Sequence, residues 1–160
     1  MADTGAPIIR RAVPADAPGL SAMLQELVAA GKRTRPADEA FVLATYVAPP
    51  QGISCFVAEA ENGRLLGLQA LSRAAAANPY GTPEGWGIIG THVSPAAARR
   101  GVGKGLFFAT RAAAEAAALP AIEAYIGAAN SEGQGYYEAM GFRTWRTPDG
   151  SVCKRYDLDL

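Results

Sequence analysis

Residues Val93 to Phe107 read VSPAAARRGVGKGLF, and the interpretation of the whole chain starts from this stretch. An apolar, β-branched run ends here, because the proline at position 95 cannot continue the hydrogen-bond ladder of a sheet. Two arginines and three alternate glycines follow, and then an alanine-rich segment with high helix propensity, Leu106 to Leu119. Backbone N–H groups at a helix start have no intrahelical partners and carry partial positive charge. The strand, basic turn and helix therefore predict a phosphate-binding site.

Length and composition predict one globular domain, residues 1–160, with 19% charged and 49% hydrophobic residues. Fifteen basic and fifteen acidic residues give zero net charge, so we expect neither nucleic acid nor a membrane surface as a partner. No apolar run reaches the roughly 18 residues of a membrane helix, and the N-terminus does not resemble a signal peptide, so a cytoplasmic location is expected. Cys55 and Cys153 have no metal-type spacing; we expect two reduced thiols and no metal site.

Turn signals and periodicity predict the other elements. Asn62-Gly63 favours a tight hairpin between two β-rich runs, Ile53–Glu61 and Arg64–Ser72, with positive φ at both turn residues. The same kinds of signal predict a strand at Ile8–Ala12, helices at Ala17–Ala30 and Asp38–Tyr46, strands at Trp86–Val93 and Ala121–Ile126, a helix at Ser131–Met140, and strands at Phe142–Trp145 and Val152–Leu158. A strand, helix and strand in succession form a crossover unit with parallel strands, so the fold class is α+β with a mixed sheet.

The glycine spacing excludes two common nucleotide-binding motifs. A P-loop needs Ser or Thr directly after its Gly-Lys pair, but Gly105 follows Lys104. A dinucleotide fingerprint needs its third glycine at position 106, where this chain has leucine. The glycines alone are also compatible with a tight turn that binds nothing.

The wider pattern resembles the GCN5-related N-acetyltransferase (GNAT) family. The hairpin, strand, Val-x-Pro, basic Gly-x-Gly turn, helix and strand lead to residues 130–142, which read NSEGQGYYEAMGF, and the similarity is specific mainly over 86–142. The resemblance implies a three-layer fold with a mixed, mostly antiparallel twisted sheet and a splayed central parallel strand pair flanked by helices. It also implies that acetyl-CoA donates an acetyl group to the primary amine of a small-molecule or amino-acid-like acceptor.

The resemblance further assigns binding roles to individual positions. It places the coenzyme pyrophosphate on the turn and the pantetheine arm along the preceding strand and the next helix. The residues so implicated are Thr91, His92, Val93, Arg99, Arg100, Gly101, Val102, Gly103, Lys104, Asn130, Gly133 and Tyr136. The family's first turn position is Gln or Arg, but Ala98 occupies it here, so a register shifted to Arg100 stays open. Asn130 could instead simply cap the following helix.

Catalysis by such a protein needs an acid for the departing thiolate and a neutral amine. The resemblance assigns the acid to Tyr137, since a phenol with an ordinary pKa of about 10 is protonated at pH 7. The alternative for Tyr137 is packing under the sheet. Many family members carry the base as a glutamate where this chain has Gly87, so Glu84, the single histidine His92 and a water relay are the candidates.

The basic loop Lys32, Arg33 and Arg35 is most simply a solvated face. The alternative is that it overhangs the acceptor site and pairs with an acidic acceptor's carboxylate or phosphinate.

The closing motifs are also similar to the phosphinothricin acetyltransferase branch. Two other functions stay open, a protein N-terminal or lysine acetyltransferase and a non-catalytic acyl-CoA-binding domain, and a homodimer is a reasonable expectation.

Overall fold

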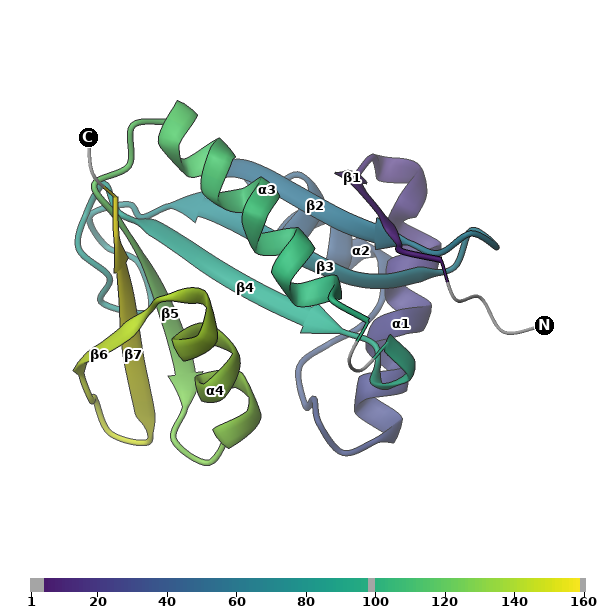
Figure 1. Cartoon of the computed structure of the whole chain (residues 1–160). Coiled ribbons are helices and arrows are strands. Elements are labelled where there is room, and N and C mark those ends of the chain that lie inside the picture. The colour runs from purple at the N-terminus through teal and green to yellow at the C-terminus, as the bar shows by residue number, and fades with distance from the viewer. Residues whose placement is uncertain (1–4, 98–99, 159–160) are drawn as a thin grey trace.

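The computed structural model describes residues 5–97 and 100–158, which form a seven-stranded sheet with helices on both faces (Figure 1). The strands are β1 (Ile8–Arg11), β2 (Gly52–Glu59), β3 (Leu65–Arg73), β4 (Gly87–Val93), β5 (Ala121–Gly127), β6 (Arg143–Arg146) and β7 (Ser151–Asp157). The helices are α1 (Ala17–Ala29), α2 (Glu39–Val42), α3 (Val102–Ala116) and α4 (Ser131–Met140), with short turns η1 (Pro14–Asp16), η2 (Leu43–Val47) and η3 (Pro95–Ala97). The predicted α+β class is confirmed.

The sheet has the order β1-β2-β3-β4-β5-β7-β6, and only β4 and β5 pair in parallel. Helix α3 connects these two strands, so the predicted crossover unit is confirmed. Their register covers only Gly87–Ile89 against Ile122–Ala124. Beyond it, Gly90–Val93 pairs with β3 on one edge and, within the described part of the chain, with no strand on the other. The predicted splay of the central parallel pair is therefore present.

Alternating side chains divide the core between the two faces of the sheet. On β2, Cys55 and Val57 pack with α1 and α2, whereas Ala58 packs with α3 on the opposite face. A third cluster joins α3 and α4 to the sheet around β4 and β5. Cys55 and Cys153 are both buried free thiols, as predicted.

Two local predictions are wrong in detail. Helix α3 begins at Val102, four residues before the predicted Leu106, because Gly101 takes a left-handed φ of 73° at the N-cap and lets the chain turn directly into the helix. In the β2–β3 hairpin only Gly63, with φ 86°, is left-handed. The turn is longer than two residues, since the N–H of Ala60 bonds to the carbonyl of Arg64.

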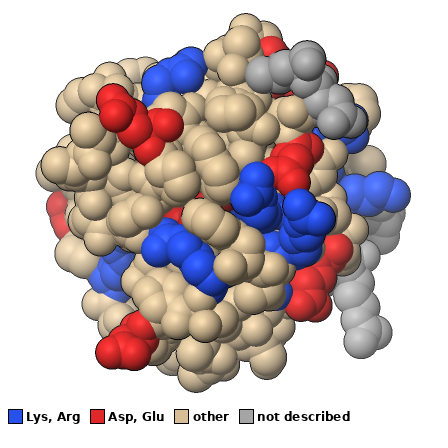
Figure 2. All heavy atoms as spheres, turned by 90° about the vertical axis from the view of Figure 1, so that its left-hand side faces the viewer, with Lys and Arg blue, Asp and Glu red and all other residues tan. Residues whose placement is uncertain are grey.

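The described surface mixes charges of both signs. On the face shown in Figure 2, Lys and Arg side chains lie on a largely uncharged surface with Asp and Glu side chains around them. Among the described residues, no helix is both long enough and apolar enough to cross a membrane.

Candidate active site

The open edge of β4 places predicted site residues on both faces of the sheet. Successive residues of a strand point to opposite faces. Thr91 accordingly contacts Tyr137 of α4, whereas His92 contacts Tyr46, which packs with α1 and α2. The site therefore has an α3–α4 side, which carries the predicted cofactor contacts, and an α1–α2 side.

One hydrogen-bond network joins the α3–α4 side of the site. The Thr91 and Tyr137 hydroxyls lie 2.8 Å apart, and Gln69 Nε2 donates to the Thr91 hydroxyl and to the Tyr136 hydroxyl, both at 3.0 Å. The Tyr136 hydroxyl in turn donates to the Gly103 carbonyl at 2.6 Å. The network thus connects the Tyr137 phenol on α4, through β4 and β3, to the first turn of α3.

Gln69 is the member of this network that sequence reasoning missed. It is fully buried on β3 directly opposite Thr91, and its Oε1 has no partner among the residues that the structure describes. A single amide inside the apolar run LLGLQAL, residues 65–71, was the available signal.

Burial keeps both tyrosines of the network protonated. It raises the pKa of Tyr137 above its ordinary value, and the bond with Thr91 only partly opposes this shift. Burial also raises the pKa of Tyr136 to about 12, against the opposing effect of its hydrogen bonds. Both phenols are therefore neutral at physiological pH and able to donate a proton.

The N-terminus of α3 has the features of an anion site. The first bond of the helix joins Gly105 N to Gly101 O, which leaves the N–H groups of Val102, Gly103 and Lys104 without an acceptor from the helix. Lys104 is exposed, and Arg100 lies just before the helix. The predicted Arg99 contact lies outside the described residues.

Asn130 and Gly133 form the N-terminal cap of α4. The Asn130 side chain accepts a hydrogen bond from Gly133 N at 2.9 Å, so the capping role left open from the sequence is confirmed. A Cβ on residue 133 would lie 2.5 Å from Asn130 Nδ2, which explains the glycine. A pantetheine contact by Asn130 stays a prediction.

The α1–α2 side of the site holds His92. Its Nδ1 lies 3.5 Å from Arg33 Nη1, and its ring centroid lies 5.2 Å from that of Tyr46. Burial, followed by the positive charges of Arg33 and Arg35, lowers the pKa of His92 to about 3. The imidazole is therefore neutral at physiological pH.

The other base candidates are placed differently. Glu84 is exposed in the loop before β4, and the strand residues Gly87–Gly90 alone put about 13 Å between that loop and Thr91. At position 87 a Cβ would lie 2.8 Å from Leu119 and 2.9 Å from Leu71, so a carboxylate has no room there. The structure does not bring Glu84 to Tyr137.

Comparison with protein families identifies the chain. The model of the acetyltransferase (GNAT) family matches residues 20–142. This chain belongs to the GNAT acetyltransferase family. A comparison with curated proteins finds no match.

Solved structures share the fold at low identity. A GCN5-related N-acetyltransferase from Kribbella flavida is 21% identical with a TM-score of 0.77, covering 96% of this chain and 98% of that one. A phosphinothricin acetyltransferase from Sinorhizobium meliloti, in complex with acetyl-CoA, is 20% identical with a TM-score of 0.75, covering 96% and 89%. The N-acetyltransferase PaiA from Thermoplasma acidophilum, in complex with coenzyme A, is 17% identical with a TM-score of 0.73, covering 94% and 98%.

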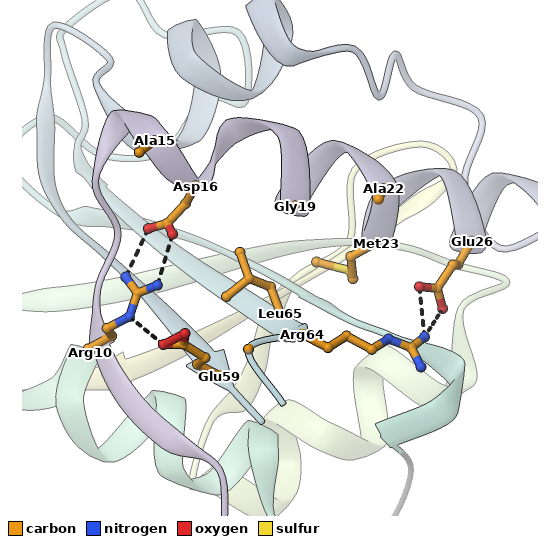
Figure 3. A pocket seen from close by; sticks show the side chains of 11 residues that line it. Arg10, Ala15, Asp16, Gly19, Ala22, Met23, Glu26, Glu59, Arg64 and Leu65 are labelled. Atoms are coloured by element: carbon orange, nitrogen blue, oxygen red, sulfur yellow. Dashed lines mark hydrogen bonds and ion pairs between the residues drawn. The ribbon is translucent and has the colours of Figure 1, made fainter. Parts of the chain in front are cut away.

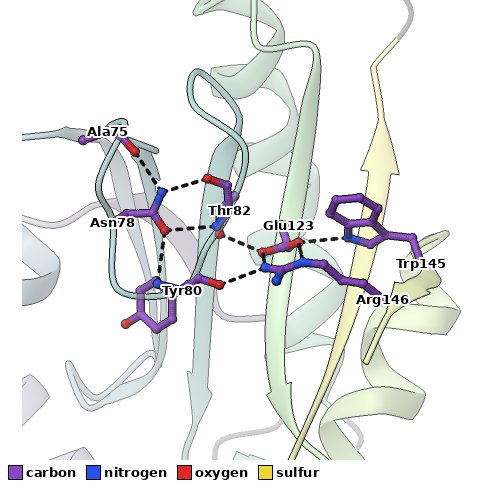
Figure 4. Close-up of polar contacts among 7 residues, drawn as sticks. All are labelled: Ala75, Asn78, Tyr80, Thr82, Glu123, Trp145 and Arg146. Atoms are coloured by element: carbon purple, nitrogen blue, oxygen red, sulfur yellow. Dashed lines mark hydrogen bonds and ion pairs between the residues drawn. The ribbon is translucent and has the colours of Figure 1, made fainter. Parts of the chain in front are cut away.

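A second buried polar cluster of this GNAT protein surrounds Glu123 on β5 (Figure 4). This fully buried carboxylate accepts bonds from Arg146, at 2.6 and 2.9 Å, from Thr82 at 2.7 Å and from Trp145 at 2.9 Å. Arg146 also donates to the Tyr80 carbonyl at 2.9 Å. Because donors already surround it, Glu123 fastens the loop before β4 to the sheet and is not a candidate base.

A surface hollow of about 300 Å³ lies beside α1 (Figure 3). Its charged side chains are already paired: Arg10 with Asp16 and Glu59, and Arg64 with Glu26. The charged side chains that line the hollow therefore offer no unpaired charge to a ligand. The candidate active site is the edge of β4 beyond its pairing with β5.

Proposed function

We propose that this protein transfers an acetyl group from acetyl-CoA to the primary amine of a small-molecule or amino-acid-like acceptor. The observation that carries the proposal is the network from the neutral Tyr137 phenol to the first turn of α3, beside the open edge of β4. The Sinorhizobium meliloti and Thermoplasma acidophilum proteins with the same fold are complexes with acetyl-CoA and coenzyme A, which supports the choice of donor.

The residues present fit the coenzyme. The N–H groups of Val102, Gly103 and Lys104 have no acceptor within the described part of α3, and with the neighbouring side chains of Arg100 and Lys104 they suit the pyrophosphate. Among the described strands, none but β3 pairs with Gly90–Val93, so the other edge of this segment offers backbone groups to the amide-containing arm, and we assign Asn130 and Tyr136 of α4 as further contacts of that arm. When bound, acetyl-CoA supplies a thioester whose sulfur leaves as a thiolate.

Tyr137 is the proposed acid for that thiolate. Its hydroxyl is held by Thr91, and burial keeps it protonated, so its proton is available to the thiolate as the carbon–sulfur bond breaks. His92 is neutral at physiological pH, but its pKa of about 3 makes the imidazole a weak base, so we assign removal of the amine proton to water.

Replacement of Tyr137 by phenylalanine tests this assignment. We expect kcat to fall about 100-fold or more, the range for loss of a positioned acid, while acetyl-CoA affinity changes less than about threefold. Isothermal titration with acetyl-CoA and a thiol-release assay across an amine panel measure the two quantities. Tyr125→Phe, at an exposed residue of β5, is the matched control.

The same measurements separate the other functions. Acetyl-CoA binding without turnover of any amine would indicate a non-catalytic acyl-CoA-binding domain, and turnover of peptides alone would indicate a protein acetyltransferase. Absence of acetyl-CoA binding contradicts the proposal itself, and unchanged turnover in Tyr137→Phe removes the tyrosine from the mechanism.

A further inference from the structure

Arg33 is a buried guanidinium that has no counter-charge within the part of the chain that the structure describes. Its residue is only 8% exposed, and none of the described carboxylates forms an ion pair with it. Its partners are neutral: the Pro36 carbonyl at 2.6 Å, the Tyr46 hydroxyl at 3.0 Å and His92 Nδ1 at 3.5 Å. Its Nε is buried and has no hydrogen-bond partner in residues 5–97 and 100–158. The prediction of a solvated side chain is therefore wrong for Arg33.

This arrangement is costly for the fold. A buried charge is normally paired, because leaving water without compensation is unfavourable. The partly buried Arg10 and Arg146 follow the rule, each with a carboxylate within 3.0 Å. Folding alone does not explain an unpaired guanidinium at position 33, but an anion bound in the working protein does.

The loop that carries Arg33 borders the open end of β4. Lys32 Nζ lies 3.3 Å from Glu132 Oε2 in the first turn of α4, so this loop and α4 are joined at the end of the molecule where β4 and β5 diverge (Figure 1). Arg33 therefore approaches β4 from the face opposite Tyr137. Its partner Tyr46 lies in the π-helical turn η2, a geometry that is frequent at functional sites.

The surroundings of Arg33 are electropositive. Arg35, on the same loop, packs its guanidinium over the Phe41 ring at 5.2 Å, and its charge acts on His92 together with that of Arg33. Asp38 and Glu39 follow on the chain, but neither forms an ion pair with these arginines, and the Asp38 carboxylate instead caps α2 through Phe41 N. An anion that reaches this side of β4 therefore meets the positive charges of Arg33 and Arg35, which neither Asp38 nor Glu39 neutralises through an ion pair.

We propose that Arg33 binds the carboxylate of the acceptor, which makes the acceptor an α-amino acid or a close analogue. The proposal rests on the proposed acetyltransferase function. The carboxylate enters beside the partly exposed His92. It takes the place of His92 Nδ1 as the partner of Arg33 Nη1. A carboxylate held there supplies the missing counter-charge on the face of β4 opposite the Tyr137 phenol.

Matched acceptors test the assignment kinetically. L-methionine and L-phenylalanine are compared with their carboxamides, and the ratio of kcat/KM for acid over amide is measured. In Arg33→Met we expect this ratio to fall about 30-fold, the effect of losing a charge-assisted bond. Arg143→Met, an exposed arginine of β6, should leave the ratio within threefold of wild type. An equal ratio in Arg33→Met and wild type overturns the proposal.

A binding measurement separates this proposal from the acetyltransferase function. His92 is the only histidine, so its ring resonances in NMR spectra report on the Arg33 contact without overlap. We expect propionate to shift them saturably in the wild type, propionamide to leave them unchanged, and Arg33→Met to show no propionate response. A wild type that does not respond to propionate overturns the carboxylate site even if acetyl-CoA binds, whereas a saturable response without turnover of any amine leaves the site intact and refutes only the function.

Discussion

At the scale of one residue, Gly103 shows how the turn at the start of α3 depends on packing against α4. A Cβ at this position would lie 2.6 Å from Tyr136 Cε1, a distance that real Cβ contacts do not reach. The glycine therefore allows the Tyr136 ring to lie against α3 and its hydroxyl to reach the Gly103 carbonyl. Packing against Tyr136, in addition to any approach of phosphate, requires glycine here.

Alanine substitutions test this steric role. Gly103→Ala should lower the free energy of unfolding by about 1–3 kcal/mol, since the ring must move away and lose its bond. Gly135, inside α4, has no atom near its Cβ position, so Gly135→Ala should raise that free energy by about 0.5–1 kcal/mol through helix propensity. Urea denaturation measures both. A stabilised Gly103→Ala would show that Tyr136 adapts freely.

Among the elements, the loop between β3 and β4 depends on the buried Glu123–Arg146 pair. Thr82 and Tyr80 of this loop bond to Glu123 and Arg146, so the pair ties the loop to β5 and β6. The loop is consequently anchored at its centre. Asn78 completes the anchoring, because its side chain accepts bonds from the backbone N–H groups of Tyr80 and Thr82.

Removing one member of this pair should destabilise the protein strongly. Arg146→Met leaves the fully buried Glu123 without a counter-charge, which costs about 3–5 kcal/mol of unfolding free energy. Arg143→Met, on the same strand but at a surface pair with Asp157, should cost less than about 1 kcal/mol. Chemical denaturation compares the two, and adding Glu123→Gln to Arg146→Met should recover part of the loss. Equal effects at positions 143 and 146 would contradict the argument.

For the whole molecule, local signals predicted the order of elements well. Prolines, the Gly141 cap and apolar periodicity act over a few residues, so they are readable without tertiary structure. The partners of Gln69, Arg33 and Glu123 were not predicted, because each arises where segments distant in sequence meet and because charged residues are expected outside. Tyr137 was indicated by a motif of the family that the sequence resembles. The hydrogen bonds that connect Tyr137 to the first turn of α3 are visible only in the structure.

Folding of the whole molecule should depend on pH through His92. Its pKa is about 3 in the folded state and about 6.5 when unfolded, so the unfolded chain binds more protons between these values. Stability is then fully present above pH 6.5 and falls by about 1.4 kcal/mol per unit as pH decreases. Between pH 7 and 5 the wild type should lose about 2 kcal/mol more than His92→Gln in urea denaturation. The Arg10 bond lowers the pKa of Asp16, so the stability that Asp16 contributes is lost only in more acidic solution. Identical pH dependence in the wild type and in His92→Gln would mean that neither burial nor the charges of Arg33 and Arg35 lower the pKa of His92.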